Sequence, residues 1–400
     1  MNLFRQRKKN QLKKIVAIGL STLAVSSLGY ANEVVDEYEL DTVVVTAQRY
    51  EKKDIDVAAS TDVYTAEDLH RTGARNVQQA LSMATGLVYE AKGPGGVTNS
   101  TMTSKIIIRG VEKGTLVLIN GTPLNLRGLY NLEDIPLESI ERIEVVKGGG
   151  SVLYGSEATG GVINIITKKS SKGVSRTSIS TGFGNYGQEN YNLNVQENKV
   201  GFSYTYDKWG EVNGVSQTQD TKNRTMETNC NSSEKNNFTL NYSFDDKWDM
   251  VYMHDEALNR RSTSFADGWE DLSGTDQIQR RHKFTKDFLQ FNYKSDDVTG
   301  NAFYNANSLD STAYTFYTTA GKKNKVPTLS TNTLEKNRTS GFDIQKVWEQ
   351  ENGKILFGTT YQNEVYKPNL RSSADKNRSR NNFSVYGQWE TELNDSDTFT

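Results

Sequence analysis

The sequence predicts a mainly β protein, in which a transmembrane antiparallel β-barrel follows a smaller N-terminal α+β domain. First, apolar and aromatic residues alternate with polar ones from Val174 to Thr400. Second, the chain has 20 Tyr, 15 Phe and 5 Trp but a mean hydropathy of -0.67, as expected where only alternate side chains meet lipid. Third, short and long connections alternate along this region, as turns and external loops do in such barrels.

The first 31 residues read as a cleaved secretory signal peptide. They combine a basic start, an apolar core from Ile15 to Gly29 and a small-x-small ending at Ala31. Fifteen apolar residues are too few to span a bilayer comfortably. We therefore expect export, with residues 32–50 forming a short tail ahead of the first folded domain.

Composition argues against several classes of function. The net charge is -2, and without the basic leader 41 basic residues face 49 acidic ones, which excludes nucleic acid as the obvious partner. The lone Cys230 cannot form an internal disulfide, and the three histidines, His70, His254 and His282, are far apart in the sequence. We find no catalytic arrangement, metal site or cofactor motif, so the sequence predicts that the protein is not an enzyme.

The segment Asp41–Arg49 reads DTVVVTAQR and contains five β-prone residues in a row, Thr42–Thr46. Such a strand in polar surroundings can pair with the sheet edge of another protein. The alternative is that it forms the first internal strand of the domain that follows. Both interpretations place a β-strand here.

The domain that follows, residues 51–170, shows local signals for both helices and strands. A short strand is expected at Val63–Thr65, and Thr65 with Asp68 fits a capping box that starts a helix on which His70 lies at the surface. A second helix is expected at Val77–Met83. The segments Ala91–Ser104 and Asn120–Asp134 are rich in Gly, Pro and small polar residues, or contain turn signals, and are expected to be loops.

The stretch Ile140–Lys169 organises this domain, because clustered glycines join two apolar runs through tight bends. It reads IERIEVVKGGGSVLYGSEATGGVINIITKK, and upstream Ile106–Asn125 reads IIIRGVEKGTLVLINGTPLN. Together the two segments resemble the plug domain of TonB-dependent outer-membrane receptors. The turn GGGSVLYGS lacks the proline usual in that family, and glycine allows the same bend.

The resemblance implies a plug, residues 51–170, inside the lumen of a barrel that begins at residue 174. It implies that the tail carries a TonB box, offered to the periplasmic energy transducer TonB and formed by Asp41, Thr42, Val43, Val44, Val45, Thr46 and Ala47. It also implies that the two plug loops face outward toward the ligand. Arg127 and Tyr130 are the side chains there best suited to an anionic aromatic ligand.

Within residues 174–400 we count ten strands and the start of an eleventh at Thr398. Because plugged barrels need about 22 strands, we expect the sequence to be the N-terminal part of a longer protein. Tight turns are expected at Glu197–Lys199, Asp245–Lys247, Ser295–Asp297, Gln350–Gly353 and Asn394–Asp397. Long polar loops are expected at Gly210–Asn236, Ala257–Phe284, Leu309–Glu335 and Tyr366–Arg380.

These features predict a receptor in the outer membrane that imports a ferric siderophore or similar iron chelate with energy delivered through TonB. Two basic pairs at the ends of one expected loop would suit an anionic chelate: Arg260, Arg261, Arg280 and Arg281. Salt-bridged loop ends explain them equally well. Cobalamin and, more weakly, haem remain alternative cargoes. From another class of function, a passive porin or a surface adhesin would need neither plug nor TonB box.

Overall fold

The computed structural model describes residues 43–44, 49, 52–53, 60–74, 76–90, 105–111, 114–124, 132, 135–148, 154, 158–170, 173–219, 225–265, 274–319, 322–323, 328–372, 376–392 and 398–399. All of them belong to one unit, Thr42–Thr400. The predicted signal peptide lies outside the described residues.

Between residues 60 and 170, the described part of the plug forms a small mixed sheet with two short helices. Its strands are ordered β3 (Thr61–Thr65), β8 (Ile140–Lys147), β9 (Gly161–Thr167), β6 (Thr115–Ile119) and β7 (Thr122–Pro123). Strands β6 and β9 are parallel, and the other pairs are antiparallel. A separate hairpin pairs β4 (Leu87–Glu90) with β5 (Lys105–Ile108), and a 3-10 turn, η2 (Leu137–Ser139), precedes β8.

The helices of the plug begin where the sequence predicts. Helix α2 (Ala66–Arg71) starts at Thr65, whose hydroxyl accepts from the Asp68 amide while the Asp68 carboxylate accepts from the Thr65 amide, so the capping box is confirmed. Helix α3 (Val77–Leu81) starts at Asn76 and ends two residues earlier than expected. His70 is exposed on α2, as predicted.

The glycines of the organising stretch have the role that the sequence predicts for them. Gly148 and Gly161 adopt φ of 80° and 150°, and the Gly148 amide donates to the Gly160 carbonyl at 3.1 Å. A Cβ on Gly161 would lie 2.4 Å from the Val146 carbonyl oxygen. Only glycine therefore lets β9 start this close to the end of β8.

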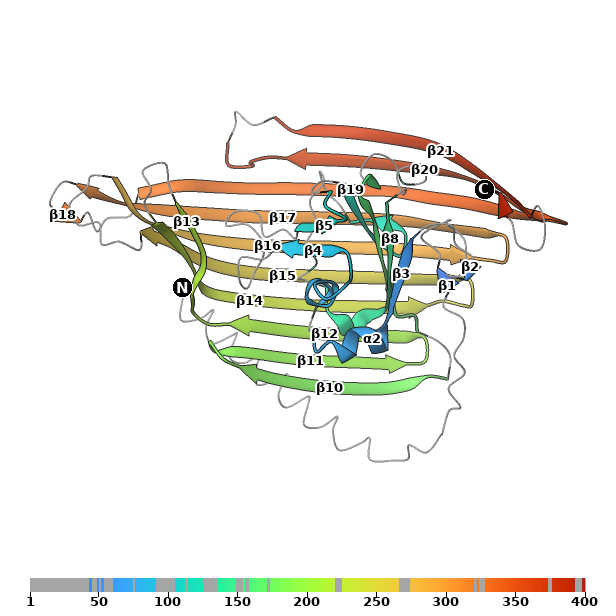
Figure 1. Ribbon diagram of the computed structural model, residues 1–400, viewed down its shortest axis with the longest axis horizontal. Helices are drawn as coiled ribbons and strands as arrows, with labels where there is room; N and C mark the ends of the chain where they lie inside the picture. Colours follow the sequence, from blue (N-terminus) through green and yellow to red (C-terminus); the bar gives the residue numbers. More distant parts are fainter. Residues whose placement is uncertain are drawn as a thin grey trace. The chain divides into compact units, whose positions relative to one another are not determined.

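The rest of the chain forms one large antiparallel sheet in which the long strands follow chain order (Figure 1). In the described ranges, eleven strands form its main path, which agrees with the ten strands and the start of an eleventh counted from the sequence. They are β10 (Ser175–Gly184), β11 (Gln188–Glu197), β12 (Val200–Trp209), β14 (Thr225–Ser243), β15 (Trp248–Phe265), β16 (Gly274–Lys294), β17 (Val298–Thr319), β19 (Thr328–Gln350), β20 (Gly353–Lys367), β21 (Arg378–Glu392) and β22 (Thr398–Phe399). Two strands lie off this path, β13 (Val212–Gln219) beside β14 and β18 (Lys322–Lys323) beside β17.

The tight turns of the large sheet lie where the alternation predicts them, after β11, β14, β16 and β19, while Asn394–Asp397 lies outside the described residues. Three of the four predicted long loops are wrong, because β14, β15, β16, β17 and β19 are 18 to 23 residues long and occupy most of Gly210–Asn236, Ala257–Phe284 and Leu309–Glu335. The fourth, Tyr366–Arg380, agrees with a connection between the end of β20 at Lys367 and the start of β21 at Arg378. A strand needs only about 9–11 residues to cross a bilayer. Beyond that length both of its faces can be polar, so the alternation that marks a strand fades although the pairing continues.

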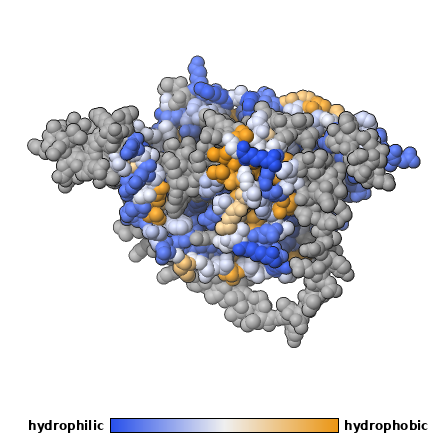
Figure 2. Space-filling view, viewed as in Figure 1, coloured by the Kyte–Doolittle hydropathy of each residue, from blue (hydrophilic) through white to orange (hydrophobic). Residues whose placement is uncertain are grey.

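The large sheet has an inner face, which contacts the plug, and an outer face opposite to it. Side chains on the inner face are mainly Asn, Gln, Ser and Thr, for example Asn190, Ser203, Thr239, Asn241 and Asn305, all buried. The outer face carries exposed large hydrophobic residues, including Ile179, Phe291, Phe342, Val385 and Trp389. On the side seen in Figure 2, hydrophobic residues form scattered groups among hydrophilic ones.

Candidate functional site between the plug and the large sheet

The hairpin that joins β6 to β7 fixes the plug to the inner face. Asn120 and Gly121 adopt φ of 47° and 80°, the left-handed conformations that an Asn-Gly turn favours. Gln290 on β16 donates to the Asn120 carbonyl at 3.2 Å and to the Thr122 hydroxyl at 2.6 Å. The Thr122 hydroxyl in turn donates to the Asn301 amide oxygen on β17 at 3.1 Å. The Asn-Gly turn thus forms hydrogen bonds to two neighbouring strands, β16 and β17. These bonds lie close to the short turn 295–297, which joins the two strands.

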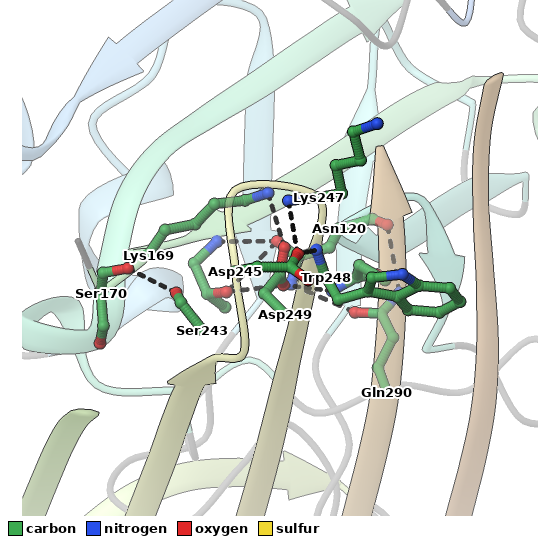
Figure 3. A network of polar contacts seen from close by, with 11 residues as sticks. Asn120, Lys169, Ser170, Ser243, Asp245, Lys247, Trp248, Asp249 and Gln290 are labelled. Carbon is green, nitrogen blue, oxygen red and sulfur yellow. Dashed lines mark hydrogen bonds and ion pairs between the residues drawn. The ribbon is translucent and has the colours of Figure 1, made fainter. Parts of the chain in front are cut away.

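A second attachment lies where the chain leaves the plug (Figure 3). The Lys169 ammonium forms a 2.8 Å ion pair with Asp249 on β15, whose other carboxylate oxygen accepts from the Asn292 amide at 2.7 Å. The Ser243 hydroxyl donates to the Ser170 carbonyl. These bonds hold both sides of the exit segment against β14 and β15.

Apolar contacts join the plug to the same strands. Val251 and Met253 on β15 and Phe288 on β16 belong to the hydrophobic core that the plug strands and helices build, and each is at most 3 % exposed. One step farther along these strands, Lys286 and Asp255 form a buried ion pair at 3.1 Å. Removal of either partner would leave an uncompensated buried charge beside these apolar contacts.

A third attachment lies just after the predicted TonB box. The Arg49 guanidinium forms a 2.9 Å ion pair with Asp343 on β19, and its side chain is 13 % exposed. It also lies over two aromatic rings, that of Tyr154 from the plug at 4.5 Å and that of Tyr386 on β21 at 4.1 Å. The Gln345 amide donates to the Arg49 carbonyl. We call this cluster the Arg49 clamp: Arg49, Tyr154, Asp343, Gln345 and Tyr386.

Glycine in the intervening strand makes the clamp possible. Tyr386 donates 3.1 Å hydrogen bonds to Asp343 and Gln345, although β20 separates β21 from β19. The ring crosses β20 at Gly358, where a Cβ would lie 2.3 Å from a ring carbon. Absence of a side chain at residue 358 therefore lets a tyrosine reach two strands away.

Electrostatics favour the charged form of Arg49 in this position. Burial lowers the pKa of its guanidinium, but the neighbouring Tyr154 and Asp343 raise it, and the net direction is upward. Burial also raises the pKa of Tyr154 to about 12, so that ring stays neutral. A permanent cation is thus held between a carboxylate and two aromatic faces.

The structure describes part of the predicted TonB box. Val43 and Val44 form strand β1, which pairs antiparallel with β2 (Lys52–Lys53) in a two-stranded sheet of its own. Asp41, Thr42, Val45, Thr46 and Ala47 lie outside the described residues. Within the described part of the chain, this pairing does not join the plug sheet, and the assignment as a TonB box stays a prediction.

The structure describes only some of the predicted ligand-binding residues. Arg127 and Tyr130 lie outside the described residues, as do Ala91–Ser104. Asn120–Thr122, the start of the other predicted outward loop, instead lies near the short-turn end of β16 and β17. The turn chemistry of Asn-Gly identifies a hairpin but does not indicate which end of the barrel it faces.

The four arginines are not at loop ends, which corrects the prediction. They lie on paired strands, with Arg260 opposite Arg281 and Arg261 opposite Arg280. Arg261 and Arg280 share the inner face with Met253 and Phe288, whereas Arg260 and Arg281 lie on the outer face. Arg261 is 1 % exposed and donates to Asn259, and Arg280 donates to Thr263 at 2.9 Å. Only one arginine of each sequence pair can therefore address the lumen.

The remaining titratable residues form no further centre. Among the described residues, no group of three or more His, Cys, Asp and Glu side chains is placed to hold a metal ion. His254 contacts Asp287 at 2.8 Å on the outer face, and His282 contacts Ser311 at 2.7 Å on the inner face. No helix in the described ranges is long and apolar enough to cross a membrane.

Sequence reasoning missed the Arg49 clamp, Gln290 and the Lys169–Asp249 pair. Arg49 directly follows the strand pattern of the predicted TonB box, and Asp343 and Gln345 are polar residues at inward positions of a strand. Nothing in the sequence links residues nearly 300 positions apart. The Asn-Gly turn at 120–121 was the one available signal, and it identifies the hairpin alone.

Comparison with known proteins identifies the family of the plug region. Residues 53–162 match the family model described as the TonB-dependent receptor plug domain. The chain is 29% identical over 285 residues to the vitamin B12 transporter BtuB of Vibrio cholerae serotype O1. The aligned region covers 66% of this chain and 44% of that protein. The chain thus spans less than half the length of the curated relatives that it matches.

Solved structures share the fold. A mutant of the ferric enterobactin receptor PfeA from Pseudomonas aeruginosa is 15% identical, with a TM-score of 0.56, and the match covers 89% of this chain and 58% of that one. FpvA of P. aeruginosa, solved bound to heterologous pyoverdines, is 14% identical with a TM-score of 0.51, over 88% of this chain and 57% of that one. Residues 53–162 thus match the plug domain of TonB-dependent receptors, and the chain shares the fold of these solved receptors.

Proposed function

We propose that the protein is an outer-membrane receptor that imports a ferric siderophore or a similar iron chelate with energy delivered through TonB. The observation that carries this proposal is the attachment of a family plug to the inner face of an amphipathic sheet. The attachments are side-chain hydrogen bonds, ion pairs and a shared apolar core. A passive porin needs no such stopper.

The outer face supports a location in a membrane. Apolar and aromatic side chains face outward across neighbouring strands, as in the register row Phe202, Leu240, Tyr252, Leu289 and Tyr304. The inner face is mainly polar. This arrangement, apolar outside and polar inside, is that of a barrel in the outer membrane. With the predicted signal peptide, it supports export to that membrane.

Coupling to TonB would use strand addition at Asp41–Ala47. The ladder between β1 and β2 holds only two residue pairs, Val43 with Lys53 and Val44 with Lys52, so its hydrogen bonds can be exchanged for those of a partner strand. The Arg49 clamp then holds the next residues to β19 and β21. We infer that ligand binding loosens this region and that a pull on the strand opens a path through the plug.

The cargo is proposed from the inward cations and from the relatives. Arg261 and Arg280 face each other across β15 and β16, and two guanidinium groups suit an anionic iron chelate. PfeA is a ferric enterobactin receptor. Cobalamin is the second candidate, because the curated relatives are vitamin B12 transporters. Haem is weaker, since His254 lies on the outer face and His282 is held by Ser311.

The test is uptake in a strain that lacks the gene and is complemented with variants. Radioactive iron carried by a panel of chelates, and separately labelled cobalamin, would be measured with the wild type and with a deletion of residues 41–47. We expect the deletion to abolish accumulation while ligand binding to the cell surface persists. Uptake that continues unchanged would favour a passive channel, and the absence of both uptake and binding for every ligand would favour an adhesin.

A matched pair of double variants tests the cargo site. Arg261→Gln with Arg280→Gln removes two inward cations, and Arg260→Gln with Arg281→Gln removes two outward cations from the same paired positions. At about 1 kcal/mol or more for each lost charged contact, the inward variant should bind an anionic chelate at least about 10-fold more weakly. Equal affinities for the two variants would exclude these arginines as ligand contacts.

A further inference from the structure

The attachments of the plug are unevenly distributed over the large sheet. Hydrogen bonds, ion pairs and apolar contacts join the plug and the segment before it to β14–β17, β19 and β21. Strands β10 and β11 contribute no residue to the hydrophobic core that the plug builds. Within the described ranges, their inner-face side chains form one hydrogen bond beyond these two strands, from Gln196 Nε2 to the Lys169 carbonyl at 2.9 Å. The plug is therefore held weakly on this side.

Two adjoining cavities lie between the plug and the large sheet on the same side. The larger has a volume of about 340 Å³ and lies between Ala74 and Glu138 of the plug and residues of β10 and β11, including Gly182 and Asn190. The smaller, of about 30 Å³, extends from Asn190 to β12, β14 and β15. Because Asn190 lines both cavities, they form a continuous line along the sheet.

On the plug side, two connecting segments line the cavities. The first joins α2 to α3 and contains Ala74 and Asn76, and the second, around Pro136 and Glu138, directly precedes β8. An isolated bridge pairs Asn76 with Pro136. A wider gap here therefore requires movement of connecting chain and leaves every strand pair of the plug sheet intact.

Neutral polar groups line the larger cavity on the side of the large sheet. They belong to Ser180, Thr181, Gln188, Asn190 and Asn192. Glu138 is the one charged residue among the described residues that line this cavity, and burial raises the pKa of its carboxyl. Groups that bind a solute weakly and at several points allow it both to enter and to leave. The lining is thus suited to passage rather than to tight binding.

Gly182 contributes to the volume of the larger cavity. It occupies an inner-face position of β10, opposite Asn190. A Cβ on Gly182 would lie 3.8 Å from the Asn190 Cβ, which is an ordinary contact, and the φ of Gly182 is not in the left-handed region. A larger side chain at this position is therefore compatible with the backbone and would reduce the cavity.

We propose that cargo crosses the receptor between the plug and strands β10 and β11, through the space that the two cavities begin. The plug stays bonded to β14–β17 while its two connecting segments move away from β10 and β11. The cargo that fits is a hydrophilic molecule, because amides and hydroxyls along the route replace its hydration. This inference rests on the proposed import function and adds the side of the plug on which the passage opens.

The first experiment narrows the larger cavity in the full receptor. Gly182→Leu places a branched side chain there, and Gly387→Leu is the matched control on the outer face of β21, where an added Cβ would lie 3.6 Å from the Leu356 carbonyl oxygen. Initial uptake and ligand binding at the cell surface would be measured for both variants. Because overpacking obstructs a narrow passage, we expect Gly182→Leu to slow uptake about 10-fold or more without a change in surface binding.

We expect Gly387→Leu to match the wild type. If the whole plug left the barrel, one leucine would not obstruct the open lumen, and the two variants would transport equally. Equal uptake rates for Gly182→Leu and Gly387→Leu would therefore overturn the proposal.

A reversible link tests the route independently. Ala74→Cys and Asn190→Cys, both at the larger cavity, would be joined by a short reducible thiol cross-linker in a Cys230→Ala background. We expect uptake to stop in the linked receptor and to return when the same protein is treated with a reducing agent. Uptake by the linked receptor at the rate seen after reduction would overturn the proposal.

The two proposals fail in different ways. A wild type that accumulates neither a ferric chelate nor cobalamin refutes the proposed function and the route together. TonB-dependent uptake by the wild type, with no effect of Gly182→Leu or of the link, refutes only the route.

Discussion

Substitution of Arg49 by alanine should release the chain that follows the predicted TonB box. The change removes a largely buried ion pair to Asp343, worth about 1.5–3 kcal/mol as a hydrogen bond between charged groups. It also removes two contacts with the aromatic rings of Tyr154 and Tyr386, at about 0.5–2 kcal/mol each. Since these contacts share one guanidinium they are not additive, and we expect local opening to become easier by about 2–4 kcal/mol.

The assay is limited digestion with a protease that cuts only after lysine, because loss of Arg49 then removes no cleavage site. Cleavage after Lys52 and Lys53 reports opening of β2, and an easing of 2–4 kcal/mol corresponds to a rate increase of roughly 30- to 1000-fold when opening limits cleavage through its equilibrium. Arg71→Ala is the control, because its pair with Glu67 is exposed and is worth only about 0.3–0.5 kcal/mol. A rate for Arg49→Ala within twofold of the wild type would refute the clamp.

Three further predictions concern other contacts. Gly358→Ala would place a methyl carbon 2.3 Å from the Tyr386 ring and displace that ring, so we expect faster cleavage at the same lysines although Arg49 is intact. Hydrogen bonds from Thr65 hold the pKa of Asp68 below its usual range. This cap therefore stabilises α2 fully at a pH above the ordinary carboxyl pKa of about 3.9, and its contribution to stability is lost as the pH falls through the lowered pKa. Thr65→Ala should cost about 1 kcal/mol, seen as faster hydrogen exchange in α2 at neutral pH and as a smaller dependence on pH below 4. Phe288→Ala should cost about 3–5 kcal/mol through the cavity left between plug and large sheet, and unchanged exchange in β6 and β9 would contradict this.

Local rules predicted the local parts of the fold. The capping box at Thr65, the glycine bends near Gly161 and the short turn at 295–297 each depend on a few adjacent residues, and all three were placed correctly. The alternation of apolar and polar residues predicted the number of strands on the main path of the large sheet in the described ranges. Their lengths were not predictable from it, because outside the lipid a strand such as β19 needs no apolar side and resembles a loop.

The candidate site was less predictable because its contacts are distant in sequence. Arg260 and Arg261 look equivalent as a basic pair, yet adjacent residues of a strand point to opposite faces, and only the register decides which faces the lumen. Arg49 and Asp343 have no pattern in common. Their contact is completed by Tyr386, whose ring reaches Asp343 across Gly358 because that residue has no side chain. This arrangement is visible only from the register of β19, β20 and β21.

Strand β3 comes first in the chain among the strands of the five-stranded plug sheet and lies at one edge of it, where it pairs with β8 through residues Thr61–Thr65. Force applied from the N-terminal side arrives at this margin before it reaches the buried pair β6 and β9. Such a force could separate β3 from β8 while β8, β9, β6 and β7 stay hydrogen-bonded to one another. The plug could then unfold in part, and β3 could pair again with the strands that remain folded.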